Sequence, residues 1–235
     1  MSTPNPSNNI EHTPCPQCNR APRYCVCEFI TQIPTTLKLL ILQHPQEPGV
    51  DIGTVPIVAA SFPQAIVKTG LSWANLHKAL GFAAENKKWG VLYVGSVHVE
   101  ELPEQGTLFV VDKNGSPVAD QTGALEELEG VVLLDGTWSQ AKTLWWRNAW
   151  LLKLKRLVLR PARTSLYDRI RKEPRKGCLS TVETVGEVVT VLEKRSDVQE
   201  LLEKPLRELV ERLSKHRPRG ARPKRWGRGR SRQAR

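Results

Sequence analysis

Short unbroken apolar runs, separated by turn residues or by segments of helical periodicity, constrain the fold of this chain more than any other feature. Such runs lie at residues 37–42, 65–67, 91–94, 108–111, 131–134 and 157–159. Unbroken apolar strands are typical of sheets that are covered on both faces, and such sheets are mostly parallel. The 235 residues suffice for one domain of ordinary size with appendages. The sequence therefore predicts an α/β domain with a mostly parallel sheet.

Helical patterns lie between and after these runs. Residues 54–61 and 72–80 are predicted to form short helices, the second with Ser72 as its N-cap, and another helix is predicted to begin near Ser139. Two longer helices are expected at 181–192 and 197–213, because apolar side chains recur there at helical spacing.

The positive charge is unevenly distributed. The formal net charge is +11, but residues 215–235 hold ten Lys or Arg and no Asp or Glu, which leaves +1 for the first 214 residues. This tail and the polar residues 1–13 are predicted to be disordered, because neither has an apolar pattern. A second basic stretch, 153–176, carries a net charge of +8. It fits phosphate binding, and a solvated surface is the alternative.

Several classes of protein are disfavoured by what the sequence lacks. No apolar run approaches the roughly 18 residues that span a bilayer. The first residues do not place a basic segment before an apolar one, as a secretory signal does. We therefore expect a cytoplasmic protein that does not bind membranes. A Rossmann methyltransferase and a phosphoryl-transfer enzyme are disfavoured, because neither glycine-rich phosphate-binding motif is present.

Four of the five cysteines lie close together in the pattern C-x2-C-x6-C-x-C, at Cys15, Cys18, Cys25 and Cys27. Two close pairs on a short loop can place four thiolates tetrahedrally around one Zn²⁺. The alternatives are small buried thiols or a redox C-x-x-C, but the latter usually precedes a helix, whereas proline follows Cys15. We predict a zinc knuckle at residues 14–30. Its role is expected to be structural, because four protein ligands leave no open position on the metal.

Residues 133–150 place an acid at the end of an apolar strand. Asp135 follows the run 131–134, and Gly136 and Thr137 form the turn that leads to the helix expected near Ser139. Ligands of α/β sheets bind outside the carboxyl ends of the strands, so Asp135 is well placed to meet a substrate. Asp135 could instead cap the next helix, and the tryptophans of this segment could be core residues. The residue pattern leaves these interpretations open.

The sequence Asp135-Gly136-Thr137-Trp138, directly after an apolar strand, resembles the motif that names the DTW-domain family. One departure is Gly53-Thr54-Val55-Pro56, where the family tends to have an Asn-Thr pair and then an arginine. Other segments that resemble the family follow in order between about Cys15 and Val191: the cysteine cluster, Gln43-His44-Pro45 with Glu47, Ser165-Leu166-Tyr167 with Arg169, and Leu179-Ser180-Thr181-Val182-Glu183.

This resemblance implies a fold similar to that of SPOUT methyltransferases, in which a knotted C-terminal part of the sheet binds the cofactor. It implies a tRNA-uridine aminocarboxypropyltransferase, which moves the 3-amino-3-carboxypropyl group of S-adenosylmethionine to N3 of a tRNA uridine and releases 5′-methylthioadenosine. Residues 31–214 would form the catalytic domain, between the zinc knuckle and the basic tail at 215–235.

The resemblance also suggests roles for individual residues. Asp135 is the predicted catalytic residue, as the base that removes the N3 proton. Alternatively, it orients the base or holds the amino group of the cofactor. The residues expected at S-adenosylmethionine are Thr54, Leu134, Gly136, Thr137, Leu159, Ser180, Thr181 and Glu183, of which the last three also fit a helix start. The residues expected at the tRNA are Trp138, Arg160, Arg163, Tyr167, Arg169 and Arg171.

Two other functions remain compatible with the sequence. One is a SPOUT-type RNA methyltransferase, which would share the cofactor and the fold. The other is a zinc-knuckle RNA-binding protein without catalytic activity. Thermal stabilisation by S-adenosylmethionine would separate an enzyme from a pure RNA-binding protein, because a ligand stabilises only the protein that binds it.

Overall fold

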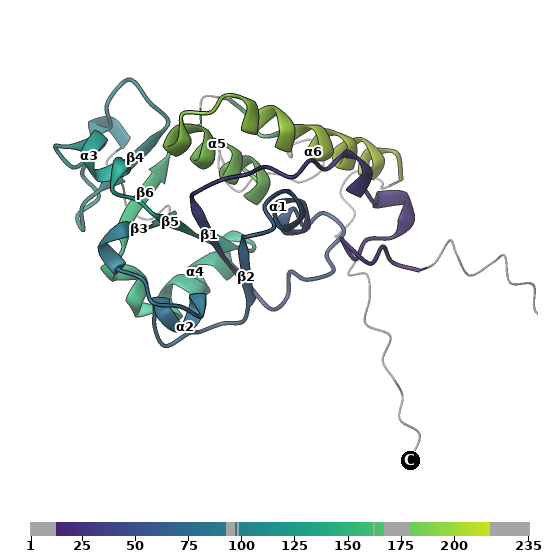
Figure 1. The fold of residues 1–235 in the computed structure, drawn as a ribbon, viewed down its shortest axis with the longest axis horizontal. Coiled ribbons are helices and arrows are strands. Elements are labelled where there is room, and N and C mark those ends of the chain that lie inside the picture. The colour runs from purple at the N-terminus through teal and green to yellow at the C-terminus, as the bar shows by residue number, and fades with distance from the viewer. Residues whose placement is uncertain (1–12, 93–96, 98, 162, 167–178, 217–235) are drawn as a thin grey trace, which may run out of the picture.

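A six-stranded sheet organises the computed structural model, which describes residues 13–92, 97, 99–161, 163–166 and 179–216. The strand order is β2-β1-β5-β3-β6-β4 (Figure 1). β4 runs antiparallel to β6, and the other neighbouring strands are parallel. The predicted mostly parallel sheet is thus confirmed. The strands are β1 (Lys38–Gln43), β2 (Ile66–Thr69), β3 (Trp89–Leu92), β4 (Leu108–Val111), β5 (Gly130–Asp135) and β6 (Lys155–Leu159).

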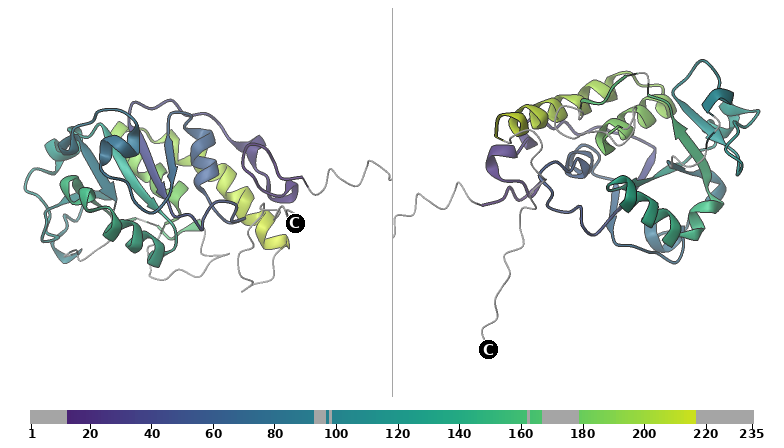
Figure 2. Two further views of the ribbon diagram at one scale, coloured as in Figure 1. Left: turned by 90° about the horizontal axis from the view of Figure 1, so that it is seen from below. Right: turned by 180° about the vertical axis from the view of Figure 1, so that it is seen from behind.

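Helices cover both faces of this sheet (Figures 1 and 2). On one face lie α1 (Val55–Ser61), α5 (Thr181–Glu193) and α6 (Asp197–His216), which pack against one another. On the other face lie α2 (Leu76–Leu80) and α4 (Trp138–Arg147). The short helix α3 (Gln121–Glu126) contacts β4 near the edge of the sheet.

The central strands are apolar throughout because both of their faces are buried. In β1, Leu39 and Ile41 belong to the core on the α5 side, whereas Leu40 and Leu42 belong to the core on the α4 side. This alternation follows from the two-residue period of a strand. It explains why the strands read as unbroken apolar runs in the sequence.

The predicted helix at 72–80 is wrong in its first part. α2 begins at Leu76, and its N-cap is Asn75, whose side-chain oxygen accepts a hydrogen bond from the Lys78 N–H at 2.9 Å. Ser72 caps nothing, because its hydroxyl donates to the carbonyl of Arg147 at 3.0 Å. A tertiary contact therefore uses the hydroxyl that the sequence pattern assigned to a local cap.

The cysteine segment shares its core with the rest of the chain. Ala21, Tyr24 and Val26 are buried in the same apolar cluster as Leu209 and Leu213 of α6. Figures 1 and 2 show this segment, in purple, beside the C-terminal half of α6. The apolar core therefore continues across the predicted boundary between the knuckle and the rest of the domain near residue 30. The terminal segments 1–13 and 215–235 lie outside the described residues, apart from Thr13, Lys215 and His216.

Within the described part of the chain, no helix combines the length and the apolar character that crossing a bilayer requires.

Candidate functional site

Asp135 is the last residue of β5 and lies opposite Gln43, the last residue of β1. Asp135 is only 8 % exposed. The Gln43 amide donates from Nε2 to Asp135 Oδ2 at 3.0 Å, and the backbone N–H of His44 donates to the Asp135 carbonyl at 3.0 Å. Because parallel strands end at one edge of a sheet, these polar groups lie where ligands of α/β folds bind.

The second carboxylate oxygen of Asp135 is held from another element. Thr181, the first residue of α5, donates from its hydroxyl to Asp135 Oδ1 at 2.6 Å. On the other side, the hydroxyl of Thr69 at the end of β2 donates to Gln43 Oε1 at 3.3 Å. The arrangement therefore presents an oriented, largely buried carboxyl group at this edge of the sheet.

The alternative that Asp135 caps the next helix is wrong. The N-cap of α4 is Thr137, which forms a reciprocal capping box with Gln140. Gly136, between Asp135 and Thr137, has φ +155°, and a Cβ there would lie 2.8 Å from the Cβ of Gln140. The turn after Asp135 is therefore one that glycine makes readily and a larger residue would strain.

Gln140 also connects two segments of the site. Its Nε2 donates to Oε1 of Gln46 at 3.1 Å, which joins the first turn of α4 to the loop after β1. The loops that follow the two adjacent strands are thus tied together beside Asp135.

The tryptophans of α4 and the residues after it divide into two groups. Trp145 and Trp150 are buried in the core on this side of the sheet, so the core-packing interpretation is confirmed for them. Trp138 is 38 % exposed and Trp146 is 71 % exposed.

The beginning of α5 is stabilised by the capping box that its sequence predicts. Ser180 is the N-cap, and Glu183 accepts hydrogen bonds from both the N–H and the hydroxyl of Ser180. The buried Glu183 also accepts from the Ser165 hydroxyl and the Leu166 N–H, each at 2.7 Å. It therefore attaches residues 165–166 to α5. In the same first turn of α5, the N–H of Val182 donates to the hydroxyl of Thr54 at 3.3 Å.

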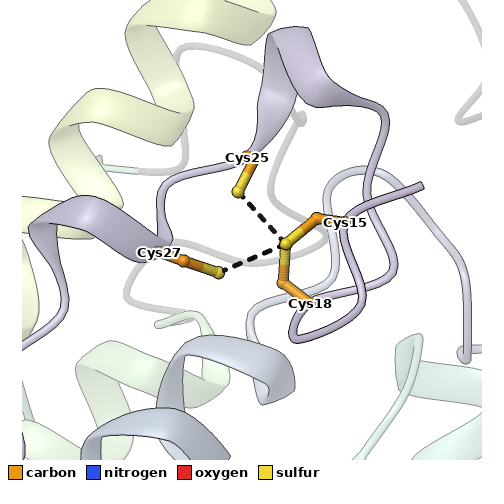
Figure 3. Close-up of side chains that lie close together, drawn as sticks. All are labelled: Cys15, Cys18, Cys25 and Cys27. Carbon is orange, nitrogen blue, oxygen red and sulfur yellow. Dashed lines mark hydrogen bonds between the residues drawn. The ribbon is translucent and has the colours of Figure 1, made fainter. Parts of the chain in front are cut away.

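The four cysteines of the knuckle converge. Their sulfur atoms all lie within 4.8 Å of one another, and Figure 3 shows them pointing toward a common centre. The Cys15–Cys27 and Cys18–Cys25 sulfur pairs are each 3.8 Å apart. With Zn–S bonds of about 2.3 Å, the edge of a regular tetrahedron of sulfur atoms is about 3.8 Å. The donor set and its spacing therefore fit a tetrahedral metal ion.

The thiols differ in how readily they ionise. Burial raises the pKa of Cys25 and of Cys27, and neighbouring sulfur atoms raise that of Cys27 further. At Cys15, burial has the same tendency, but hydrogen bonds from the backbone N–H groups of Cys18 and Gln17 outweigh it and lower the pKa to about 7. Four thiolates at this separation repel one another, which a divalent cation would relieve.

The model of the DTW domain matches residues 12–214. This chain belongs to the DTW-domain family. It is 32 % identical over 202 residues to tRNA-uridine aminocarboxypropyltransferase 2 of Macaca fascicularis, covering 83 % of this chain and 61 % of that protein. It is 32 % identical over 212 residues to the Mus musculus protein of the same name, covering 87 % and 65 %.

A Drosophila melanogaster protein, also named tRNA-uridine aminocarboxypropyltransferase 2, is 29 % identical over 203 residues, covering 83 % of this chain and 72 % of that protein. The chain thus spans less than two thirds of the length of the macaque and mouse relatives. No solved structure matches it.

An arginine of the knuckle reaches the loop that precedes α1. Arg20 of the knuckle is 2 % exposed. Its Nε donates to the carbonyl of Asp51 at 3.2 Å, and its Nη2 donates to the carbonyl of Gly53. This loop leads directly into Thr54 and α1. The knuckle and the sheet edge are therefore connected through Arg20, a role that no local sequence signal indicated.

Two basic residues expected at the tRNA make contacts within the DTW domain. Arg160 donates to the carbonyls of Pro103 and Glu104 and lies over the ring of Phe109, 4.9 Å from its centroid. Arg163 forms ion pairs with the buried Glu187 and Glu203.

The other residues of the predicted site are also placed, as far as the structure describes them. Tyr167, Arg169 and Arg171 lie outside the described residues. Leu159 ends β6, which is separated from β5 by β3, so it lies farther along the same edge than Leu134 and Thr137. Gln43 was missed as a partner of Asp135, although each is the last residue of a strand.

Proposed function

We propose that this protein is a tRNA-uridine aminocarboxypropyltransferase that uses S-adenosylmethionine as its co-substrate. The names of the relatives support this activity. The observation that carries the proposal is the buried carboxylate of Asp135, oriented by Gln43 and Thr181 at the carboxyl edge of the sheet. Acids held at this edge meet ligands in α/β folds.

In the proposed reaction, N3 of the uridine attacks the carbon of the aminocarboxypropyl group that is bonded to sulfur. The N3–C bond forms as the C–S bond breaks, and the electron pair of that bond returns to sulfur. The sulfonium thereby becomes the neutral thioether of 5′-methylthioadenosine. The N3 proton passes to a base. Three carbons are bonded to the sulfonium, so the protein selects the product by holding one of them in line with N3.

Asp135 is the proposed base for the N3 proton. The alternative is that it holds the ammonium group of the co-substrate, which suits an ionised carboxylate equally well. Asp135→Asn separates the two roles, because the amide keeps the shape but accepts no proton. If Asp135 is the base, Asp135→Asn should lose much of its kcat, change little in KM for S-adenosylmethionine, and recover part of its activity at high pH. If Asp135 instead holds the ammonium group, the variant should mainly show a raised KM for S-adenosylmethionine.

The co-substrate is proposed to lie along the carboxyl edge of the sheet in a SPOUT-like, knotted arrangement. Its contacts would come largely from backbone groups, since the side chains of Thr54, Ser180 and Glu183 already bond within the protein. The proposed contact residues are Thr54, Leu134, Gly136, Thr137, Leu159, Ser180, Thr181 and Glu183.

The metal of the knuckle is proposed to be Zn²⁺ with a structural role. Cys15, Cys18, Cys25 and Cys27 would hold it, and four sulfur ligands favour zinc among the common divalent ions. The tRNA is proposed to approach Asp135 through Trp138 and the basic residues of the second half of the chain, with Arg160, Arg163, Tyr167, Arg169 and Arg171 as candidates.

The decisive experiment uses two batches of S-adenosylmethionine, one labelled in the methyl group and one in the carboxyl group, with unmodified tRNA. Carboxyl label in the RNA without methyl label is the expected result. Methyl label in the RNA would make the protein an RNA methyltransferase. If neither label is transferred and S-adenosylmethionine does not raise the Tm, the protein is an RNA-binding protein without this activity.

A further inference from the structure

The outward face of α4 carries a row of residues that the core does not use. Trp138, Lys142 and Trp146 are four residues apart along the helix, so they lie on one side of it. All three are exposed, Trp138 at 38 % and Trp146 at 71 %. Leu144, on the opposite side of α4, is buried in the core, and Trp145, beside this row, is buried as well. We call this exposed row of Trp138, Lys142 and Trp146 the α4 stripe.

The α4 stripe begins at the candidate active site. Trp138 is the first residue of α4 and lies three residues after Asp135. In Figure 1, α4 leaves the sheet beside the end of β5 and lies against the face away from α5 and α6. The stripe thus leads away from Asp135 over a surface that those two helices leave uncovered.

The helix of the stripe and the residues directly after it are basic. Between Gly136 and Leu154 the chain holds Lys142, Arg147 and Lys153 and no Asp or Glu. All three are exposed, and their ammonium and guanidinium groups form no described ion pair. A polyanion would therefore be attracted to this face.

Exposed indole rings beside cations suit the binding of unpaired nucleotides. Unpaired bases stack on aromatic side chains, whereas bases within a duplex are covered by their neighbours and are not available for stacking. Eight residues of helix extend about 12 Å. That length corresponds to about three to four nucleotides of a stacked strand at roughly 3.4 Å each.

We propose that the α4 stripe binds unpaired nucleotides of the RNA substrate, with Trp138 and Trp146 stacking on bases and Lys142 contacting a phosphate between them. This inference rests on the proposed function, and it adds that the target uridine is presented from a single-stranded loop. Bases bound along the stripe would lead toward Asp135.

The test measures binding of fluorescently labelled RNA to the full-length protein at two salt concentrations. The probes are a tRNA-derived stem-loop and a fully paired duplex of equal length. Trp146→Ala is expected to weaken stem-loop binding about tenfold and to leave duplex binding unchanged. Trp146→Phe is expected to retain most of the affinity. Lys142→Gln is expected to weaken both probes and to reduce the salt dependence by about one phosphate contact.

Phe82 provides a matched control. Phe82 is 38 % exposed, as is Trp138, and the Lys38 ammonium lies 5.6 Å from the centroid of the Phe82 ring. Lys38 begins β1, so this aromatic–lysine pair lies at the edge of the sheet opposite to Asp135. Phe82→Ala is expected to leave both affinities unchanged.

Unchanged stem-loop binding in Trp146→Ala, or an equal loss for stem-loop and duplex, would overturn the stripe as a base-stacking surface. The wild-type transfer assay is run in parallel. Transfer by the wild type with unaltered binding in the variants overturns only this inference. Selective loss of stem-loop binding in a protein that transfers nothing supports the stripe and overturns the proposed function.

Discussion

The cysteine knuckle and the Asp135 site are built in opposite ways. The knuckle draws its four sulfur ligands from thirteen consecutive residues, 15–27. The Asp135 site draws its side chains from the ends of β1, β2 and β5 and from the start of α5, so Gln43 and Thr181 bond to an acid far from both in sequence. A local site can be recognised from spacing, whereas a distributed site exists only once the sheet has formed.

The two regions are nevertheless joined. Arg20 of the knuckle holds the carbonyls of Asp51 and Gly53, and the next residue, Thr54, accepts a hydrogen bond from Val182 in the first turn of α5. Thr181, beside Val182, bonds to Asp135. A continuous series of contacts therefore runs from the knuckle to the candidate catalytic residue.

Disrupting the knuckle should have the largest effect on stability. Cys18→Ser, or metal removal by a chelator, is expected to cost on the order of 5 kcal/mol, because a structural metal site contributes its binding energy to folding. In a chain of this size that lowers the Tm by more than about 10 °C. Calorimetry measures the Tm, and metal analysis measures the metal content of the same samples. An unchanged Tm in metal-free protein would show that the knuckle is not structural.

Asp135→Ala should show the opposite pattern, a loss of activity larger than its loss of stability. Removing a general base lowers the rate by about 10²–10⁴, which is about 3–5 kcal/mol in the barrier. The measurement is aminocarboxypropyl transfer, with the Tm as control. Transfer within tenfold of the wild type would remove Asp135 from the chemistry.

Arg20→Met tests the connection between the regions. It removes two donors from buried carbonyls and is expected to cost about 2 kcal/mol of stability. The expected signature is a raised KM for S-adenosylmethionine with unchanged zinc content, because the loop before Thr54 loses its support. Arg20→Lys, which keeps the charge, should recover part of the effect. Loss of zinc with an unchanged KM for S-adenosylmethionine would instead mean that Arg20 stabilises only the knuckle and does not support the loop before Thr54.

The smallest effect is expected at Glu193, which belongs to neither region. Burial opposes its ionisation, but hydrogen bonds from the Thr35 hydroxyl and from the N–H groups of Thr36 and Leu37 outweigh this and lower its pKa. A lowered pKa stabilises the folded state above the unfolded value near 4.5, and this stabilisation is lost as the pH falls below it.

Glu193→Gln should therefore lower the Tm at pH 7 by the equivalent of about 1 kcal/mol. The difference from the wild type should shrink as the pH falls from 5 toward 3. Thermal unfolding across this pH range measures it. A constant difference would mean that the ionised carboxylate is not responsible.

Much of the architecture follows from local pattern. The apolar runs at 37–42, 108–111, 131–134 and 157–159 all contain or overlap strands, and the helices at 181–192 and 197–213 form nearly as expected. The spacing of Ser180 and Glu183 predicts the capping box that begins α5. Such features depend on residues within a few positions of one another, which is what a sequence displays directly.

The start of α2 and the antiparallel direction of β4 could not be obtained in this way. Ser72 fits a helix cap, but its hydroxyl bonds to the end of α4. β4 resembles the parallel strands in composition, yet it pairs with β6 in the reverse direction. In each case a distant contact competes with the local preference and prevails.

The order of strands and helices, the clustering of the four cysteines and the place of Asp135 at the end of a buried strand can all be predicted from local pattern. The contacts of Gln43 and Thr181 with Asp135, the reach of Arg20 to Gly53 and the burial of Trp145 and Trp150 depend on the folded chain. The two groups differ in the sequence separation of the residues involved. Periodicity and capping arise among neighbours in the chain, whereas burial and hydrogen-bond partners depend on which distant segments pack together.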